Sequence, residues 1–205
     1  AYSSQLKQSI QKLALVCRPP LSMSSNKMDD SRNVIDKYKN LPVEVIKQSI
    51  KRNNFSIVAC NVDYNINIGT MMRTCNAFAG REFIILGRRK WDRRGAVGVQ
   101  NYENVLYIPT VEDFKVWAQK NKRTPVAVDF RPGFSIPTTK IEKYPDNPVF
   151  IFGNEGEGLP DELHNVCQLK IFINQFGSVR SMNVAVACSM IIYDWRLKHL
   201  PEDDI

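Results

Sequence analysis

The sequence has few of the residues, and none of the long apolar runs, on which several classes of protein depend. Its apolar runs, such as residues 184–187 and 190–193, are far shorter than the about 20 residues that cross a membrane. Only two histidines, His164 and His199, are present, and neither stands in a metal-ligand or triad arrangement. We therefore expect a soluble globular protein with no membrane partner, no metal site and no histidine base.

The cysteines argue against a disulfide scaffold and a zinc site. There are five, an odd number, and no two of them have a CxxC or other short metal-ligand spacing. A chain of 205 residues, 43% of them hydrophobic, can bury a sufficient core without disulfides. This pattern predicts an intracellular, reducing compartment, with the cytoplasm favoured over the mitochondrial matrix.

Acidic residues are missing from residues 1–28, which contain four basic residues and six serines. This composition resembles an organellar transit peptide, and it also suits an amphipathic helix that belongs to the fold or contacts RNA. We favour the helix, followed by a linker that contains Pro19 and Pro20. The expected organisation is an N-terminal extension, residues 1–40, and one domain, residues 41–205.

An excess of basic residues favours a polyanionic partner. The formal net charge is +7 at pH 7, and basic residues gather around Trp91 between residues 81 and 94. Guanidinium groups beside an aromatic ring suit phosphate contact and base stacking, so this segment is the expected RNA-binding loop. The alternative is a solvated loop around a core Trp. The expected RNA contacts are Arg88, Arg89, Lys90, Arg93 and Arg94.

Short apolar segments alternate with helix-like segments in the main domain, which predicts an α/β fold with a mostly parallel sheet and helices on both faces. The expected strands are residues 55–61, 82–86, 105–108, 125–129, 148–152 and 169–173. The expected helices are residues 42–52, 68–79, 111–120, 161–166 and 181–198. Ligands of such sheets bind beyond the carboxyl ends of strands, so the turns after Asn61, Phe152 and Ile173 are the expected site.

The first of these turns contains Asn67, which stands six residues before Arg73. Six residues are about one and two-thirds helical turns, so a shared helix face is only approximate. If Asn67 lies in the turn and caps the helix, Arg73 can reach back over the helix start. The alternative is a capping Asn followed by a surface Arg.

The second turn reads Gly153-Asn-Glu155-Gly-Glu-Gly158-Leu and allows close approach of its backbone to a ligand. It matches neither GxGxxG nor GxxxxGK[ST], and its two carboxylates disfavour a phosphate. A Rossmann-type nucleotide enzyme is therefore disfavoured. An acidic, glycine-rich strand end suits a cationic or adenosine-bearing ligand, such as a sulfonium; the alternative is a flexible turn before a short helix.

The third turn passes through Gly177 and enters an apolar helix. Ser181 is the expected N-cap, with Val184 opening the apolar stripe. Asn183 is poorly placed for helix propensity on the first turn, so its amide is free to fix a neighbouring loop or a substrate hydroxyl.

In this order the three turns resemble the motifs of the TrmH (SpoU) family of the SPOUT superfamily, which are AdoMet-dependent RNA ribose 2′-O-methyltransferases. The first motif stands here as Asn67 and Arg73, the second as residues 153–159 and the third as residues 177–184, with Met182 in place of the usual Leu. The likeness covers about residues 53–198. Residues 1–40 match no pattern of the family.

The resemblance implies a deep C-terminal trefoil knot, S-adenosyl-L-methionine as cofactor, and a homodimer. The apolar breadth of the last helix fits a helix with one face against a partner, although a helix buried within one chain would show the same breadth. The implied cofactor contacts are Phe152, Gly153, Glu155, Gly158, Ile173, Gly177, Met182 and Val184. The implied catalytic set is Arg73, Asn67, Glu155, Ser181 and Asn183, with Arg180 as a further RNA contact.

By resemblance, Arg73 stands at the ribose hydroxyl. A general-base role conflicts with the persistent protonation of guanidinium groups, so we favour a role in orienting phosphate and stabilising a developing alkoxide. The chain shows no separate substrate domain, which slightly favours tRNA over rRNA. A non-catalytic RNA-binding or ribosome-assembly factor is the alternative, and the presence of the whole catalytic set argues against it.

Overall fold

The computed structural model describes residues 30–179 and 181–199, and the residues from Arg32 onward belong to one compact unit. Most of the expected N-terminal extension, residues 1–40, lies outside the described residues, as does the expected RNA contact Arg180. The boundary near residue 40 and the role of Arg180 therefore stay predictions.

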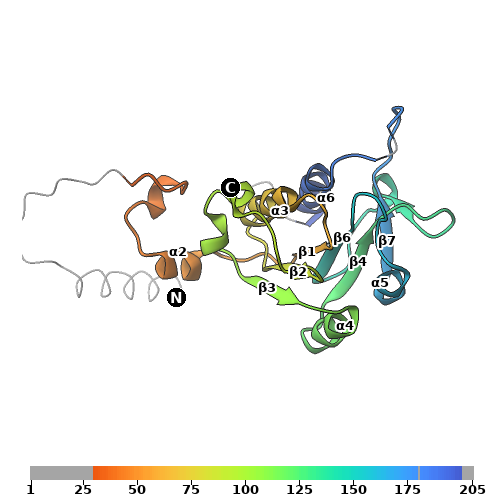
Figure 1. The fold of residues 1–205 in the computed structure, drawn as a ribbon, viewed down its shortest axis with the longest axis horizontal. Helices are drawn as coiled ribbons and strands as arrows, with labels where there is room; N and C mark the ends of the chain where they lie inside the picture. Colours follow the sequence, from red (N-terminus) through yellow and green to blue (C-terminus); the bar gives the residue numbers. More distant parts are fainter. Residues whose placement is uncertain (1–29, 180, 200–205) are drawn as a thin grey trace, which may run out of the picture. The chain divides into compact units, whose positions relative to one another are not determined.

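The strands of the described chain form one sheet in which every neighbouring pair is parallel (Figure 1). They are β1 (Ser56–Cys60), β2 (Glu82–Leu86), β3 (Val105–Ile108), β4 (Thr124–Val128), β5 (Ile136–Pro137), β6 (Pro148–Phe152) and β7 (Leu169–Phe172). Their order is β3-β2-β1-β6-β4-β7-β5. Because parallel strands end at the same edge, the turns after β1, β6, β4 and β7 become neighbours in space.

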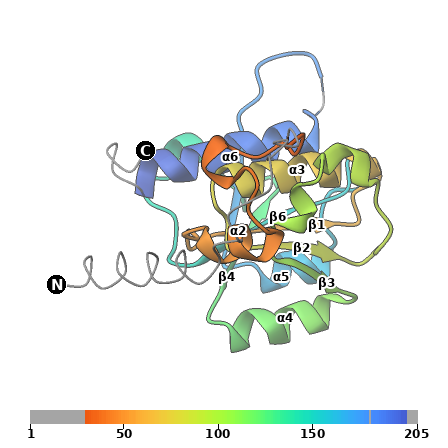
Figure 2. The ribbon, with the colours of Figure 1, turned by 90° about the vertical axis from the view of Figure 1, so that its left-hand side faces the viewer.

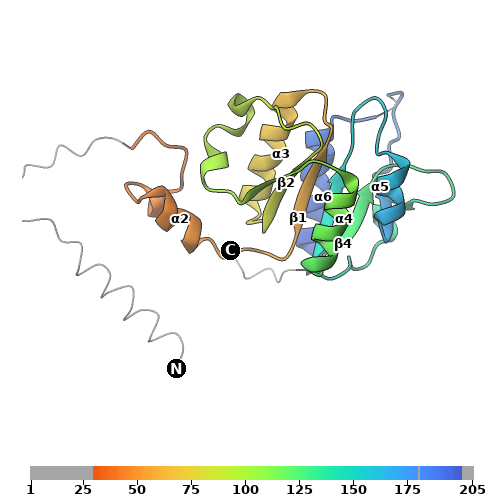
Figure 3. The ribbon, with the colours of Figure 1, turned by 60° about the horizontal axis from the view of Figure 1, so that its bottom comes forward.

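Helices cover both faces of this sheet. In Figures 1 and 2, α3 and α6 lie side by side on one face, whereas α4 and α5 lie on the other, which Figure 3 brings forward. The helices are α2 (Val43–Ser49), α3 (Asn65–Ala77), α4 (Val111–Lys120), α5 (Asp161–Val166) and α6 (Val184–His199). Short 3-10 turns are η1 (Asp36–Tyr38), η2 (Arg93–Ala96), η3 (Val99–Asn101) and η4 (Thr138–Lys140). Within residues 30–179 and 181–199, no helix has the length and apolarity to cross a membrane.

Strand residues alternate between two apolar cores, one on each face of the sheet. In β1, Ile57 and Ala59 belong to the core that contains α3 and α6, whereas Val58 and Cys60 belong to the core that contains α4 and α5. All residues of β1 and β6 are buried. These two central strands have no solvent face, which explains why their sequences are continuously apolar.

The expected fold class, a parallel sheet with helices on both faces, is confirmed, and each expected strand agrees with an observed one to within one residue. The edge strand β5 was not expected, because Ile136 and Pro137 are too short a pair to show alternation. The trefoil knot implied by the resemblance stays a prediction.

Two expected helix starts are wrong. Asn67 lies inside α3, past its start, and so does not cap it, and Ser181 lies before α6 rather than at its cap. Asn183 caps α6 instead, since its Oδ1 accepts hydrogen bonds from the amides of Ala185 at 2.9 Å and Val186 at 3.2 Å. Only the residue directly before the first helical residue reaches these amides, so Asn183 displaces Ser181 from this role.

A buried carboxylate ties together segments near the amino-terminal edge of the sheet. Glu103 is 2% exposed and accepts hydrogen bonds from Arg52 Nη1 at 2.8 Å and Asn76 Nδ2 at 2.5 Å. Burial raises the pKa of this carboxyl, and the hydrogen bonds from Arg52 counter only part of the rise. Loss of Arg52 alone would leave a buried and uncompensated charge.

We expect Arg52→Met to lower the free energy of unfolding by about 3–5 kcal/mol at pH 7, measured by urea denaturation. Arg52 lowers the pKa of Glu103 against the effect of burial, so without Arg52 the folded state binds a proton on this carboxyl at a higher pH than the wild type does. Protonation then removes the buried charge. The loss should therefore shrink as the pH falls from 7 toward 5.

Lys115→Met is the matched control, since the ion pair of Lys115 with Glu112 is exposed, and a change within about 0.5 kcal/mol is expected. A loss at Arg52 no larger than that at Lys115, or one that does not change with pH, would contradict the assignment.

Candidate functional site

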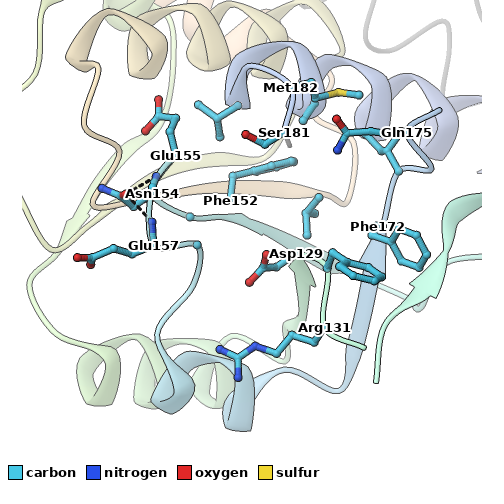
Figure 4. Close-up of a pocket in the computed structure, with 18 residues that line it drawn as sticks. Asp129, Arg131, Phe152, Asn154, Glu155, Glu157, Phe172, Gln175, Ser181 and Met182 are labelled. Atoms are coloured by element: carbon cyan, nitrogen blue, oxygen red, sulfur yellow. Dashed lines mark hydrogen bonds between the residues drawn. The ribbon is translucent and has the colours of Figure 1, made fainter. Parts of the chain in front are cut away.

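The carboxyl ends of β4, β6 and β7, together with the segment before α6, surround a cavity of about 580 Å³ (Figure 4). This volume lies in the usual range of small-molecule sites. Gly177, one of the expected cofactor contacts, is exposed in the loop between β7 and α6 and does not line the cavity. The other expected contacts all line it: Phe152, Gly153, Glu155, Gly158, Ile173, Met182 and Val184.

The turn after β6 brings the backbones of Gly153 and Gly158 so close that no side chain fits at Gly153. A Cβ atom on Gly153 would lie 2.4 Å from the carbonyl oxygen of Gly158, so this position needs glycine. The backbones of Asn154 and Gly158 exchange two hydrogen bonds, of 3.1 and 2.9 Å. The turn is therefore a fixed backbone loop that forms one wall of the cavity.

Three side chains connect the three expected turns. Asn67 Nδ2 donates a hydrogen bond to Glu155 Oε1 at 2.7 Å, and Asn183 Nδ2 donates one to Asn67 Oδ1 at 3.2 Å. The other oxygen of Glu155 accepts a hydrogen bond from the amide of Asp63 at 3.1 Å. Residues that stand up to 116 positions apart in the sequence thus meet in one chain of hydrogen bonds, which we call the Asn67–Glu155–Asn183 chain.

The members of the expected catalytic set differ in how they reach the cavity. Glu155 and Ser181 line it directly, and the hydrogen bonds of Asn67 and Asn183 connect these two residues to it through Glu155. Arg73 is separate from them. It is exposed on α3, does not line the cavity, and forms no hydrogen bond or ion pair with another residue of the described chain.

Helix geometry explains the position of Arg73. Because Asn67 is already helical, the two side chains are separated by about one and two-thirds turns and point to different sides of α3. Arg73 shares its side with Ile66, Thr70 and Ala77, which are exposed as well. The structure therefore brings together all of the expected catalytic set except Arg73.

Two of the five expected RNA contacts already have acidic partners. Arg88 Nη1 lies 3.2 Å from Asp63 Oδ1, and Arg94 Nη2 lies 2.6 Å from Asp92 Oδ2. Hydrogen bonds from Arg94 hold the pKa of Asp92 below its usual range. The positive charge of these two arginines is thus partly neutralised within the chain.

The remaining three contacts, Arg89, Lys90 and Arg93, are exposed. The guanidinium of Arg89 lies over the ring of Tyr107, 5.4 Å from its centroid. Trp91 is partly buried and packs against the core on the α3 and α6 face, so it matches the alternative of a core Trp. The loop therefore offers basic groups to a partner, while the ring expected to stack on a base is engaged in the fold.

The turn after β4 adds residues that the sequence pattern did not single out. Asp129, Phe130 and Arg131 line the cavity. Asp129 Oδ2 accepts hydrogen bonds from His164 Nε2 at 2.9 Å and from the amide of Leu159 at 3.3 Å. One signal could have revealed Asp129, because it directly follows a buried strand that ends at the same edge as β6.

The lining combines acidic groups with an apolar wall. Asp129, Glu155 and Glu157 supply carboxylates, and Phe152 and Ile173 supply apolar surface. An adenosine-bearing sulfonium needs an apolar slot for its base and acceptors for its cationic and hydroxyl groups. The residues present therefore fit S-adenosyl-L-methionine.

The fold is similar to solved structures of RNA-modifying enzymes. One is the AdoMet-bound rRNA methyltransferase from Sinorhizobium meliloti, which superposes with a TM-score of 0.66 at 23% identity, over 76% of this chain and 61% of that chain. At this identity the likeness shows the fold alone.

Two relatives are named as tRNA (guanosine(18)-2′-O)-methyltransferases. The protein from Aquifex aeolicus is 24% identical over 159 residues, which are 70% of this chain and 69% of the relative. The mouse (Mus musculus) protein TARBP1 is 23% identical over 149 residues, which are 70% of this chain and 9% of the relative. The chain therefore spans about a tenth of the length of the mouse relative.

A family model described as the SpoU rRNA Methylase family matches residues 54–193. The matched region contains all three turns, every residue that lines the cavity, and the whole Asn67–Glu155–Asn183 chain. Since this region is more than half of the 205 residues, the chain belongs to the SpoU rRNA Methylase family.

Proposed function

We propose that the protein transfers a methyl group from S-adenosyl-L-methionine to a ribose 2′-hydroxyl of RNA. The observation that carries the proposal is the meeting of three distant turns at one cavity, with the Asn67–Glu155–Asn183 chain at its side. The family assignment and the names of the relatives support it.

The substrate we favour is tRNA over rRNA, because the Aquifex and mouse relatives are both named for a tRNA guanosine. The Sinorhizobium structure is named for rRNA, so RNA is the class and tRNA the narrower proposal. An intracellular, reducing compartment with the cytoplasm favoured stays our prediction for its location.

S-adenosyl-L-methionine supplies a sulfonium methyl group that transfers by in-line displacement with a neutral leaving group. The residues of the chain therefore have mainly to position the reactants. The fixed turn from Gly153 to Gly158 offers backbone groups, and Phe152 excludes water from one side. The carboxylate of Glu155 accepts hydrogen bonds from Asn67 and from the amide of Asp63, which fix its orientation beside the cavity.

Arg73 is the residue we assign to the RNA. It is exposed on α3, and no described residue takes up its guanidinium, so the group is free to bind a phosphate oxygen in a planar, two-pronged geometry. In that position it orients the nucleotide and stabilises the alkoxide that develops as the hydroxyl loses its proton.

In an assay with methyl-labelled S-adenosyl-L-methionine and total tRNA, we expect label to be recovered as a 2′-O-methylnucleoside after digestion. Arg73→Lys keeps the charge but loses the planar fork, so kcat/KM should fall at least about a hundredfold. The Kd for S-adenosyl-L-methionine, measured by calorimetry, should stay within about twofold because Arg73 does not line the cavity.

Arg81→Lys is the matched control, since Arg81 is exposed, pairs with Glu82, and lies at the opposite edge of the sheet. Its kcat/KM should remain near that of the wild type. Near-normal turnover by Arg73→Lys would remove the assigned role of Arg73, and label recovered on a base rather than a ribose would remove the proposed reaction.

The basic loop is expected to carry part of the RNA affinity through its three exposed residues. The triple variant Arg89→Gln, Lys90→Gln, Arg93→Gln should weaken RNA binding and reduce the slope of log K against log salt by about 2, at about 0.7 for each phosphate contact. Filter binding at several salt concentrations measures both quantities.

The control is Lys120→Gln, Lys122→Gln, Lys143→Gln, which removes the same charge from exposed positions at the other edge of the sheet. It should leave the slope nearly unchanged. If both triple variants change the slope equally, net charge rather than the loop explains the binding.

The proposal includes a homodimer through α6. Four large apolar side chains on this helix are exposed, and their spacing of four, three and four residues puts them on one side. An exposed apolar stripe of this length is typical of an interface between subunits. The stripe consists of Val186, Met190, Tyr193 and Leu197.

The stripe continues onto α3. The ring of Tyr193 lies 6.4 Å from that of Phe78, centroid to centroid, and the hydroxyls of Thr74 and Ser189 are hydrogen-bonded at 2.8 Å. Arg73 is exposed and directly precedes Thr74, which is buried. A partner subunit on this surface would therefore stand close to Arg73.

We expect the double variant Met190→Glu, Tyr193→Glu to convert a dimer into a monomer, as measured by light scattering after gel filtration, because two charges would be buried without partners. Val116→Glu, at a 55% exposed position on α4, is the control and should leave the mass unchanged. A wild-type chain that is monomeric at high concentration, or a double variant that stays dimeric, would contradict the assigned surface.

A further inference from the structure

Asp129 has one carboxylate oxygen fully engaged by the fold and one that receives no hydrogen bond from the described residues. Oδ2 accepts from His164 Nε2 at 2.9 Å and from the amide of Leu159 at 3.3 Å. The side chain is 26% exposed and is among those that line the cavity (Figure 4). Oδ1 is therefore available to a ligand in the cavity.

The buried ring of His164 is hydrogen-bonded to this carboxylate. Its side chain is 3% exposed, in α5, and its other ring nitrogen, Nδ1, has no hydrogen-bond partner in the part of the chain that the structure describes. Among the described residues, the single hydrogen-bond partner of the ring is thus Asp129. Burying a polar ring with one unsatisfied nitrogen costs stability. The hydrogen bond that the ring does form fixes the orientation of the Asp129 carboxylate.

The turn after β6 also makes room for this carboxylate. Gly158 has a φ of +72°, and a Cβ atom there would lie 3.0 Å from Asp129 Oδ2. Glycine is favoured at this position both by its backbone conformation and by the closeness of the oxygen. The turn after β6 and helix α5 therefore both hold Oδ2 of the carboxylate that follows β4, whereas Oδ1 accepts no hydrogen bond from the described residues.

Arg131, a basic residue that lines the cavity, pairs with groups other than Asp129. Arg131 Nη1 lies 2.6 Å from Asp161 Oδ1, and Arg131 Nη2 donates to the carbonyl of Leu159 at 3.2 Å. With its guanidinium engaged at the rim, the negative charge of Asp129 is left for a donor or cation that enters the cavity.

We propose that Asp129 is a cofactor-binding residue whose Oδ1 accepts a hydrogen bond from an O–H or N–H donor of S-adenosyl-L-methionine, and that His164 is its positioning residue. The inference rests on the proposed function, since it concerns the same cavity. Two groups of the cofactor supply such a donor, the ribose diol and the α-ammonium group, and a carboxylate accepts from either.

Calorimetric titration of the isolated protein with three probes tests the proposal and separates the two donors. The probes are S-adenosyl-L-methionine, methylthioadenosine, which lacks the amino acid, and the 2′,3′-dideoxy analogue of methylthioadenosine, which also lacks the diol. For Asp129→Asn we expect affinity for S-adenosyl-L-methionine to fall roughly tenfold to a hundredfold.

The pattern over the probes identifies the donor. If the α-ammonium group binds Asp129, Asp129→Asn weakens only S-adenosyl-L-methionine. If the diol binds it, the variant weakens S-adenosyl-L-methionine and methylthioadenosine but spares the dideoxy analogue. Unchanged binding of S-adenosyl-L-methionine, or equal weakening of all three probes, would overturn the proposal, the second outcome indicating a purely structural role.

The positioning role has its own pair of variants. His164→Leu removes the donor to Oδ2 and should weaken S-adenosyl-L-methionine about fivefold, whereas His164→Gln returns an N–H near the place of Nε2 and should restore affinity to within about twofold. The probe that lacks the donor group should bind both variants like the wild type. Failure of rescue by Gln, or equal loss with that probe, would overturn the role of His164.

Glu162→Gln is the matched control, because it removes an exposed carboxylate of α5 that does not line the cavity, and its affinities should match the wild type. The readout is binding rather than methyl transfer. A wild-type protein that binds no S-adenosyl-L-methionine would overturn the proposed function together with this inference, whereas normal binding by Asp129→Asn would overturn the inference alone.

Discussion

The hydrogen bond between Asn67 and Glu155 is the contact on which the arrangement of the site depends. It joins the first turn of α3 to the turn after β6, 88 residues later. Parallel pairing makes this possible, since Ala59 near the end of β1 lies beside Phe152 at the end of β6, so the chain leaves both strands at the same point of the sheet edge. Asn183 then couples the start of α6 to the same pair, and the cavity lies where these segments and the end of β4 meet.

Charge is divided sharply between the cavity and the rest of the molecule. The chain carries a formal charge of +7, yet the cavity is lined by three carboxylates, those of Asp129, Glu155 and Glu157, and by one arginine, Arg131, which pairs with Asp161. Carboxylates inside attract a cationic cofactor and repel phosphate, so a polyanion has to be bound by groups outside the cavity. We propose the exposed basic residues after β2 and Arg73 on α3 as such groups.

The sequence predicts the strands well because each central strand is buried on both faces and reads as a continuous apolar run. Helix starts are harder to predict, because several neighbouring polar residues are suitable caps and tertiary contacts determine which one is used. Asn67 lies within α3 and is hydrogen-bonded to Glu155, and Asn183 rather than Ser181 caps α6. The hydrogen bond between Asp129 and His164 joins residues 35 positions apart and depends on how α5 packs against the sheet. The local sequence pattern carries no information on this packing. Three turns could be found from their composition; the fourth could be found only from its place at the sheet edge.

The exposure of Arg73 would connect the reaction that we propose to the dimer that we propose. Among the described residues none binds its guanidinium, and α3, which carries it, is joined to α6 through the contacts of Thr74 with Ser189 and of Phe78 with Tyr193. A partner that covers the stripe would exclude water from around Arg73. Its apolar side chains would offer the guanidinium no hydrogen-bond acceptor. Desolvating a guanidinium is costly unless an anion accompanies it. The dimer we propose would thus strengthen the attraction of Arg73 for an RNA phosphate, because the charge-assisted bond then forms in a less polar surrounding than it would on the isolated subunit.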